Sequence, residues 1–347
     1  MTIRIPTPPD FSFLETRSAH GWRRLAPFVW DEDAQTLARP EVLDDGGVVE
    51  LTLQDDGDDA VRVEVMGGGD EAEIVQRVRR MLQLDVPLDG FHAYCRTQPG
   101  LAHLEQCRRG RMLRCPTLFE DTLKVIATVN TTWAQTIAMS GRLVQHFGAE
   151  GRAFPTPAQI AAVPFDKFAA KARMGYRSAY VYAIATQIVS GELDLEGWQM
   201  GADLSAGALR KRLLSLPGIG PYGAACLMLY LGKPAHVNAD SVARALLGKE
   251  LGRTVTDKEV LAFFEAHGEW RGLVYNFYPW RGTNEAMEHT DTPIIDSAPQ
   301  PGTQAASSQA DAAPEETSAQ TPRTDKAEIE AEEAAVGEGP EATPSPS

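Results

Sequence analysis

The sequence lacks the features of membrane and secreted proteins. Its 347 residues contain no run of 18 apolar residues, which is about the length that a membrane-crossing helix needs. The stretch from Met1 to Pro6 contains no apolar core of the kind found in signal peptides. We therefore expect a protein without membrane association that is located in the cytoplasm.

Cysteine is scarce and scattered. The four residues are Cys95, Cys107, Cys115 and Cys226, and no two of them form a Cys-x-x-Cys pair. This arrangement favours free thiols in a reducing compartment over a disulfide framework.

Aromatic residues are absent from residues 283–347, where Pro, Ala, Ser, Thr, Gln and Glu dominate. Such a segment cannot bury enough apolar surface to offset the entropy lost on ordering. Its net charge is −12. We predict a disordered acidic tail.

A net positive charge is also missing, because the whole chain carries −15. This charge argues against a nucleic-acid partner, but it is unevenly distributed. Residues 1–90 carry −10, whereas residues 91–282 carry +7. The middle segment is therefore the one suited to a phosphate backbone.

Residues 1–90 mix strand and helix patterns. Residues 48–54 and 61–66 alternate apolar and polar side chains across an Asp- and Gly-rich turn, which predicts an antiparallel hairpin. Asp70 is placed to begin a helix that continues to about Leu84. This part is predicted to be a small α+β domain with an antiparallel sheet.

Residues 205–231 have the pattern of two helices joined by a tight turn. Ser205 can cap the first helix, and the glycines of residues 217–220 break it. Pro221 is favoured in the first turn of the second helix. The N–H groups of such a turn suit an anionic oxygen, directly or through a bound cation. A plain corner in a helical core is the alternative.

Asp240 is predicted to cap a short helix that ends at Gly248. Aspartate is favoured at this position in any protein. Capping also fixes the orientation of the carboxylate between two helices, where it could take part in chemistry.

The pattern Leu-Pro-Gly-Ile-Gly-Pro-Tyr-Gly-Ala-Ala of residues 216–225, followed by Asp240 at 20 residues beyond Gly220, resembles the helix-hairpin-helix (HhH-GPD) superfamily of DNA glycosylases. The resemblance is to its 3-methyladenine glycosylase II and 8-oxoguanine glycosylase branches. It implies a mostly α protein with a two-lobed helical core at 91–282, preceded by the α+β domain at 1–90 and followed by the tail at 283–347. The double-stranded DNA partner would contain a damaged base, and the protein would be a monomer in a bacterial cytoplasm, associated with the nucleoid.

The resemblance also implies roles for individual residues. Asp240 would be the catalytic carboxylate. The hairpin that binds DNA would consist of Leu216, Gly218, Ile219 and Gly220, and the carbonyls of Leu216 and Ile219 could hold K⁺ or Na⁺. The residues that line the base pocket or enter the DNA would be Asn130, Tyr176, Arg177, Tyr222 and Cys226.

Several of these positions have a simpler interpretation. Asn130 could fill the hole left by an extruded base, or it could cap the next helix. Tyr176 and Arg177 could contact DNA beside the lesion, or they could form an ordinary corner with an aromatic plug. The basic run at residues 108–114 could face phosphate, or it could be a solvated loop.

The residue at 222 distinguishes two mechanisms. Bifunctional members of the family have a lysine two residues after the second hairpin glycine, and this amine attacks the sugar. Tyr222 stands there in this chain, so we expect hydrolysis without strand cleavage, on an alkylated purine such as 3-methyladenine. Cys226 and the Asn130, Tyr176 and Arg177 set instead resemble the 8-oxoguanine branch.

Two other functions stay open, an 8-oxoguanine glycosylase with lyase activity and a DNA-binding protein without catalysis. No cysteine follows Cys226, so the four-cysteine iron–sulfur cluster of some family members is not expected. We expect no other cofactor.

Overall fold

The computed structural model describes residues 1–57, 59–200, 204–237 and 239–278. All of them fall within the first of two compact units of the chain, Met1–Ser297. The tail predicted at 283–347 lies outside the described residues.

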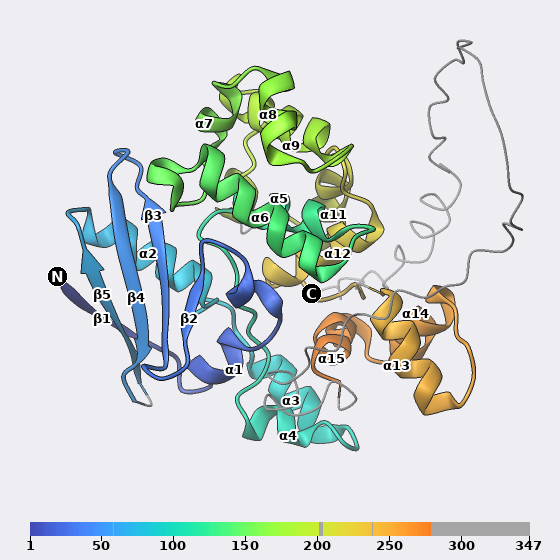
Figure 1. Cartoon of the computed structure of the whole chain (residues 1–347). Helices are drawn as coiled ribbons and strands as arrows, with labels where there is room; N and C mark the ends of the chain where they lie inside the picture. Colours follow the sequence, from blue (N-terminus) through green and yellow to red (C-terminus); the bar gives the residue numbers. More distant parts are fainter. Residues whose placement is uncertain (58, 201–203, 238, 279–347) are drawn as a thin grey trace, which may run out of the picture. The chain divides into compact units, whose positions relative to one another are not determined.

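The chain begins with a five-stranded antiparallel sheet of strand order β1-β5-β4-β3-β2 (Figure 1). The strands are β1 Thr2–Pro6, β2 Val29–Asp31, β3 Thr36–Val42, β4 Val48–Asp55 and β5 Ala60–Met66. Side chains of β4 alternate between buried and half-exposed positions, as the period of two in a strand requires. The predicted hairpin is β4 and β5, in which Leu51 pairs with Val65 and Leu53 with Val63.

Helix α2, Glu71–Met81, packs against this sheet (Figure 1). Asp70 caps it and accepts hydrogen bonds from the N–H groups of Ala72 and Glu73. The helix ends three residues before the predicted end at Leu84. Gln83 is left-handed, with φ of 51°, and this conformation cannot continue a right-handed helix.

The rest of the described chain is helical. Its helices are α1 Phe13–Arg17, α3 Asp89–Thr97, α4 Ala102–Gln106, α5 Leu118–Thr128, α6 Trp133–Phe147, α7 Pro157–Ala161, α8 Phe165–Ala172, α9 Arg177–Val189, α10 Gly197–Met200, α11 Ala206–Leu214, α12 Pro221–Tyr230, α13 Ser241–Leu251, α14 Asp257–Glu265 and α15 Arg271–Phe277, with short 3₁₀ turns η1 Gly21–Arg24, η2 Ala149–Gly151 and η3 Gly268–Trp270.

Two groups of helices share the core. Helix α5 is buried along nearly its whole length and contacts α6, α9 and α12. Helices α13, α14 and α15 pack on one another and reach the first group where α15 contacts α12. The mostly helical, two-lobed architecture behind a small antiparallel sheet confirms the predicted fold class.

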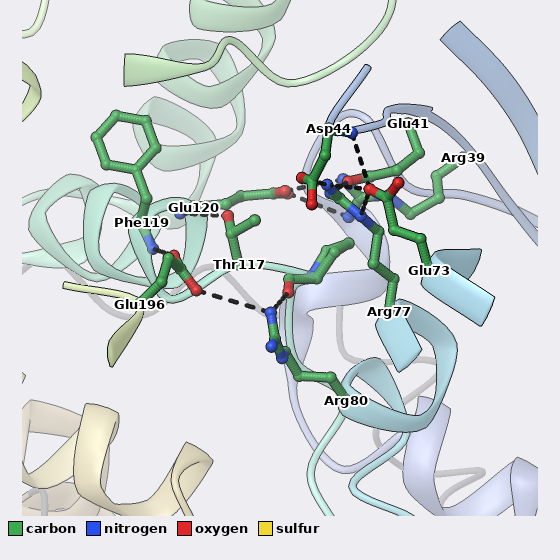
Figure 2. A network of polar contacts seen from close by, with 11 residues as sticks. Arg39, Glu41, Asp44, Glu73, Arg77, Arg80, Thr117, Phe119, Glu120 and Glu196 are labelled. Atoms are coloured by element: carbon green, nitrogen blue, oxygen red, sulfur yellow. Dashed lines mark hydrogen bonds and ion pairs between the residues drawn. The ribbon is translucent and has the colours of Figure 1, made fainter. Parts of the chain in front are cut away.

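Buried ion pairs connect the sheet to α5 (Figure 2). The Arg39 guanidinium of β3 lies 2.8 Å from the Glu120 carboxylate of α5 and 2.7 Å from Glu41. Lys124 lies 2.7 Å from Glu120, and Arg77 of α2 pairs with Glu41 at 2.5 Å. Burial alone would raise the pKa of Glu120, but the two adjacent cations outweigh it and lower this pKa to about 2. Each cation of this interface therefore lies against a carboxylate.

The basic run at residues 108–114 is part of the interior. Arg109, Arg111 and Arg114 are 8%, 2% and 5% exposed. They pair with Glu15, Asp10 and Asp121 respectively. Both sequence interpretations of this run, a phosphate contact and a solvated loop, are therefore wrong for these three arginines. Buried carboxylates and N-terminal acidic side chains balance their charge.

Candidate active site at the helix-hairpin-helix

The hairpin between α11 and α12 is a type II turn. The Ile219 N–H donates to the Leu216 carbonyl at 3.1 Å, which closes a four-residue turn with Pro217 and Gly218 at its centre. Gly218 has φ of +80°, the value that the third position of a type II turn requires. Leu216 and Ile219 are each 5% exposed, so their side chains anchor the turn in the core.

Both flanking helices begin as the sequence predicts. The Ser205 hydroxyl accepts a hydrogen bond from the Ala208 N–H and caps α11. Gly220 is exposed at the N-cap of α12, and Pro221 follows in its first turn. The backbone at Gly220 is thus available to a ligand, at the end of a helix that carries partial positive charge.

Gly218 also permits a close contact with α9. A Cβ atom at this position would lie 2.5 Å from the ring of Tyr180. We expect Gly218→Ala to lower the free energy of unfolding by about 2–4 kcal/mol, from a left-handed backbone plus overpacking. Urea unfolding measures this change.

Gly220→Ala is the matched control, because φ there is −98° and an added Cβ meets open space. It should cost well under about 1 kcal/mol. Equal losses in the two variants would contradict the packing argument.

Asp240 caps α13, as predicted. Its Oδ1 accepts a hydrogen bond of 2.8 Å from the Ala243 N–H, and its side chain is half-buried. The helix does not end at Gly248, as the sequence predicted, but continues to Leu251 and ends at the left-handed Gly252. Gly248 instead allows the backbone at Arg253 to pack closely against the helix, because a Cβ at Gly248 would lie 2.7 Å from the Arg253 carbonyl oxygen.

Tyr222, Cys226 and Tyr230 form a stripe along α12. The Cys226 side chain and burial raise the pKa of Tyr222 well above its usual value, and Asp240 adds to the shift. The Thr128 side chain, at the last residue of α5, opposes this shift in the pKa of Tyr222. The phenol is therefore neutral at physiological pH. Asp240 therefore lies within electrostatic range of the Tyr222 phenol, which is one turn of α12 before Cys226.

The N-terminal segment contributes rings to the same stripe, and the sequence did not single them out. His20 stacks on Tyr230 with ring centres 5.1 Å apart, and Trp22 lies 5.4 Å from the same ring. The Trp22 indole N–H donates to Asp121 at 3.1 Å. The spacing of four residues from Tyr222 to Cys226 to Tyr230 could have identified Tyr230. Nothing local could have identified His20 or Trp22.

Asn130 and Arg177 meet at the junction of α5 and α6. The buried Arg177 guanidinium donates to the carbonyls of Asn130 at 2.9 Å, Val129 at 3.1 Å and Met174 at 3.4 Å. Asn130 is exposed with φ of 49°, and Thr132 rather than Asn130 caps α6. Its capping interpretation is therefore wrong, and its side chain is presented to solvent on a rigidly held turn.

Tyr176 projects from the start of α9 next to this junction. It is 55% exposed, which does not fit an aromatic plug. Its ring lies 4.6 Å from the Arg177 guanidinium carbon and packs edge-on against Tyr180. Because Tyr180 also touches Gly218, the junction and the hairpin are neighbours.

Three further properties concern the described residues as a whole and the approach to the hairpin. Across the described residues, no group of three or more His, Cys, Asp or Glu side chains is placed to hold a metal ion. Lys211 and Arg212, in the last turn of α11, are exposed just before the hairpin. Within the same part of the chain, no helix combines the length and the apolar character that crossing a membrane requires.

No family model matches the sequence. The fold is similar to that of MBOgg1 solved in complex with a low-affinity DNA ligand, with a TM-score of 0.62 and 21% identity over 81% of this chain and 95% of that one. For the apo 8-oxoguanine glycosylase/lyase of Clostridium acetobutylicum, the TM-score is 0.60 and the sequence identity is 20%, over 80% of this chain and 95% of that one. For the 3-methyladenine DNA glycosylase of Archaeoglobus fulgidus, the TM-score is 0.58 and the sequence identity is 17%, over 81% of this chain and 98% of that one.

The similarity covers 95–98% of each of these structures and 80–81% of this chain. The chain therefore has the fold of the HhH-GPD DNA glycosylases, as the hairpin and Asp240 predicted.

Proposed function

We propose that this protein is a DNA glycosylase that flips a damaged purine out of the duplex and hydrolyses its N-glycosidic bond. The observation that carries the proposal is the place of Asp240, whose carboxylate is held at a helix start by hydrogen bonds from the Ala243 N–H and the Tyr275 hydroxyl. The exposed hairpin backbone at Gly220 would hold a DNA phosphate. Asn130 would fill the space of the extruded base, and Tyr176 would wedge against the base pair beside it, since both side chains are exposed.

The reaction needs a carboxylate rather than an amine. Breaking the N-glycosidic bond builds positive charge on the sugar, as in glycoside hydrolysis. Asp240 would stabilise that charge and orient the attacking water, and such electrostatic stabilisation is commonly the largest contribution to catalysis. Tyr222 occupies the place of the family's lysine, and a neutral phenol cannot form a Schiff base with the sugar. The enzyme would therefore be monofunctional.

We propose an alkylated purine such as 3-methyladenine as the substrate, because a bulky aromatic at 222 resembles that branch. Cys226 beside Tyr222 supports an 8-oxoguanine-type substrate as the alternative. The protein would act as a monomer without an organic cofactor. A carbonyl oxygen has two lone pairs, so the Leu216 carbonyl could coordinate K⁺ or Na⁺ while it accepts the Ile219 N–H.

Duplexes with a single methylated purine, hypoxanthine, 8-oxoguanine or uracil test the proposal. Wild-type protein is expected to give strand breaks on one purine lesion only after hot alkali, and no borohydride-trapped complex. Breaks without alkali, or a trapped complex, would identify a lyase and contradict the role assigned to Tyr222. Binding without breaks on every duplex would identify a non-catalytic DNA-binding protein.

A further inference from the structure

Helix α15 holds the segment that leads to Asp240. The Gly272 N–H donates to the Pro234 carbonyl at 2.8 Å, and the Arg271 guanidinium donates to the Ala235 carbonyl. A Cβ at Gly272 would lie 2.5 Å from the His236 carbonyl oxygen. The start of α15 therefore packs directly on the backbone that precedes Asp240.

One turn further along α15, Tyr275 reaches the carboxylate itself. Its hydroxyl donates a hydrogen bond of 3.3 Å to Oδ1 of Asp240. The Ala243 N–H donates to the same oxygen at 2.8 Å. In the part of the chain that the structure describes, the hydrogen bonds from Ala243 and Tyr275 to this carboxylate thus both end on Oδ1.

The Tyr275 ring is itself fixed. It is 0% exposed and packs edge-on against Phe264 of α14, with ring centres 5.3 Å apart and an angle of 85° between the planes. This is the geometry that aromatic pairs prefer. The hydroxyl therefore has a defined position before any ligand binds.

We propose that Tyr275 is a positioning residue for Asp240, which it holds through Oδ1 so that Oδ2 faces the sugar and the attacking water. This inference rests on the proposed glycosylase function. The capping bond from Ala243 alone fixes one contact, and rotation of the carboxylate about it would place the charge differently. A second donor from a separate helix removes that freedom, and preorganised charge is what stabilises a developing cation without reorganisation during the reaction.

Tyr275→Phe removes only the hydroxyl and keeps the ring against Phe264. Single-turnover base release is expected to slow about tenfold, the lower end for a hydrogen bond to a charged group. The Kd for lesion duplex should stay within about twofold, because the hydroxyl acts on Asp240 and not on DNA. Tyr278→Phe is the matched control, since Tyr278 packs edge-on against the same Phe264 ring at 5.4 Å, and it should leave the rate unchanged.

Tyr275→Phe is then combined with Asp240→Asn, which removes the charge that Tyr275 would position. In an Asp240→Asn background, Tyr275→Phe should change the residual rate by less than about twofold, because coupled residues are not additive. A tenfold loss that persists in this background, or a weaker Kd at an unchanged rate, would assign Tyr275 to direct contact with DNA and overturn the inference.

An active wild type with an unaffected Tyr275→Phe variant would overturn this inference alone. A wild type that releases no base from any duplex would overturn the proposed function and the inference together.

Discussion

Asp240→Asn is expected to release a damaged base at least about 100-fold more slowly than the wild type in single-turnover assays. The substitution removes the negative charge that would stabilise the sugar cation and keeps the size of the side chain. Asparagine is as good an N-cap as aspartate, so α13 should still begin at the same place. Binding to lesion duplex should be retained, which separates catalysis from recognition.

Asp70→Asn is the control for this experiment. Asp70 also caps a helix, through the N–H groups of Ala72 and Glu73, but it lies at the start of α2. The same chemical change there should leave base release unchanged. Equal rates for Asp240→Asn and the wild type would remove Asp240 from the mechanism.

Glu120→Gln is expected to lower the free energy of unfolding by about 3–5 kcal/mol at neutral pH, the cost of removing one member of a buried ion pair. Arg39 and Lys124 are each 1% exposed, so their charges would stay in the interior without this partner. Thermal and urea unfolding measure the loss. Glu150→Gln is the control, because its pair with Arg152 is at least half exposed and such pairs contribute about 0–1 kcal/mol.

The stability lost in Glu120→Gln should be largest at neutral pH and should decrease at acidic pH. The folded pKa of Glu120 is lowered from 4.5 to about 2, so the ionised carboxylate stabilises the fold above its unfolded pKa. This stabilisation disappears as the pH falls from about 4.5 toward 2. The difference between wild type and Glu120→Gln should therefore be constant above about pH 5 and shrink below it. A difference independent of pH would contradict the ionic role of Glu120.

The sequence predicted the hairpin, the start of α13 and the β4–β5 pairing because local rules decide them. A type II turn needs glycine at Gly218, and a helix start favours Ser205 or Asp240 whatever surrounds it. The end of α13 was predicted wrongly for a related reason. Gly248 looks like a helix stop, but its small size serves the contact with the Arg253 carbonyl, which no local rule describes.

Contacts between distant segments could not be predicted. Arg111 pairs with Asp10, about a hundred positions earlier in the chain, and a basic run carries no sign of such a partner. His20 reaches Tyr230 in the same way. The candidate site was predicted where a pattern of residues marks it, on α12 and at Asp240. The rings that the N-terminal segment adds to it became visible only in three dimensions.

The burial of several cations affects how the affinity for DNA should depend on salt concentration. Arg109, Arg111, Arg114, Lys124 and Arg177 belong to the segment that carries +7, yet all are at most 8% exposed and their charges cannot reach a phosphate. Each phosphate that a protein neutralises releases condensed counterions and steepens the dependence of affinity on salt by about 0.9 in logarithmic slope. The salt dependence of the DNA binding proposed here would therefore come from exposed cations such as Lys211 and Arg212, and not from these five. Its logarithmic slope should be smaller than the segment's 22 basic residues would give if all of them met phosphates.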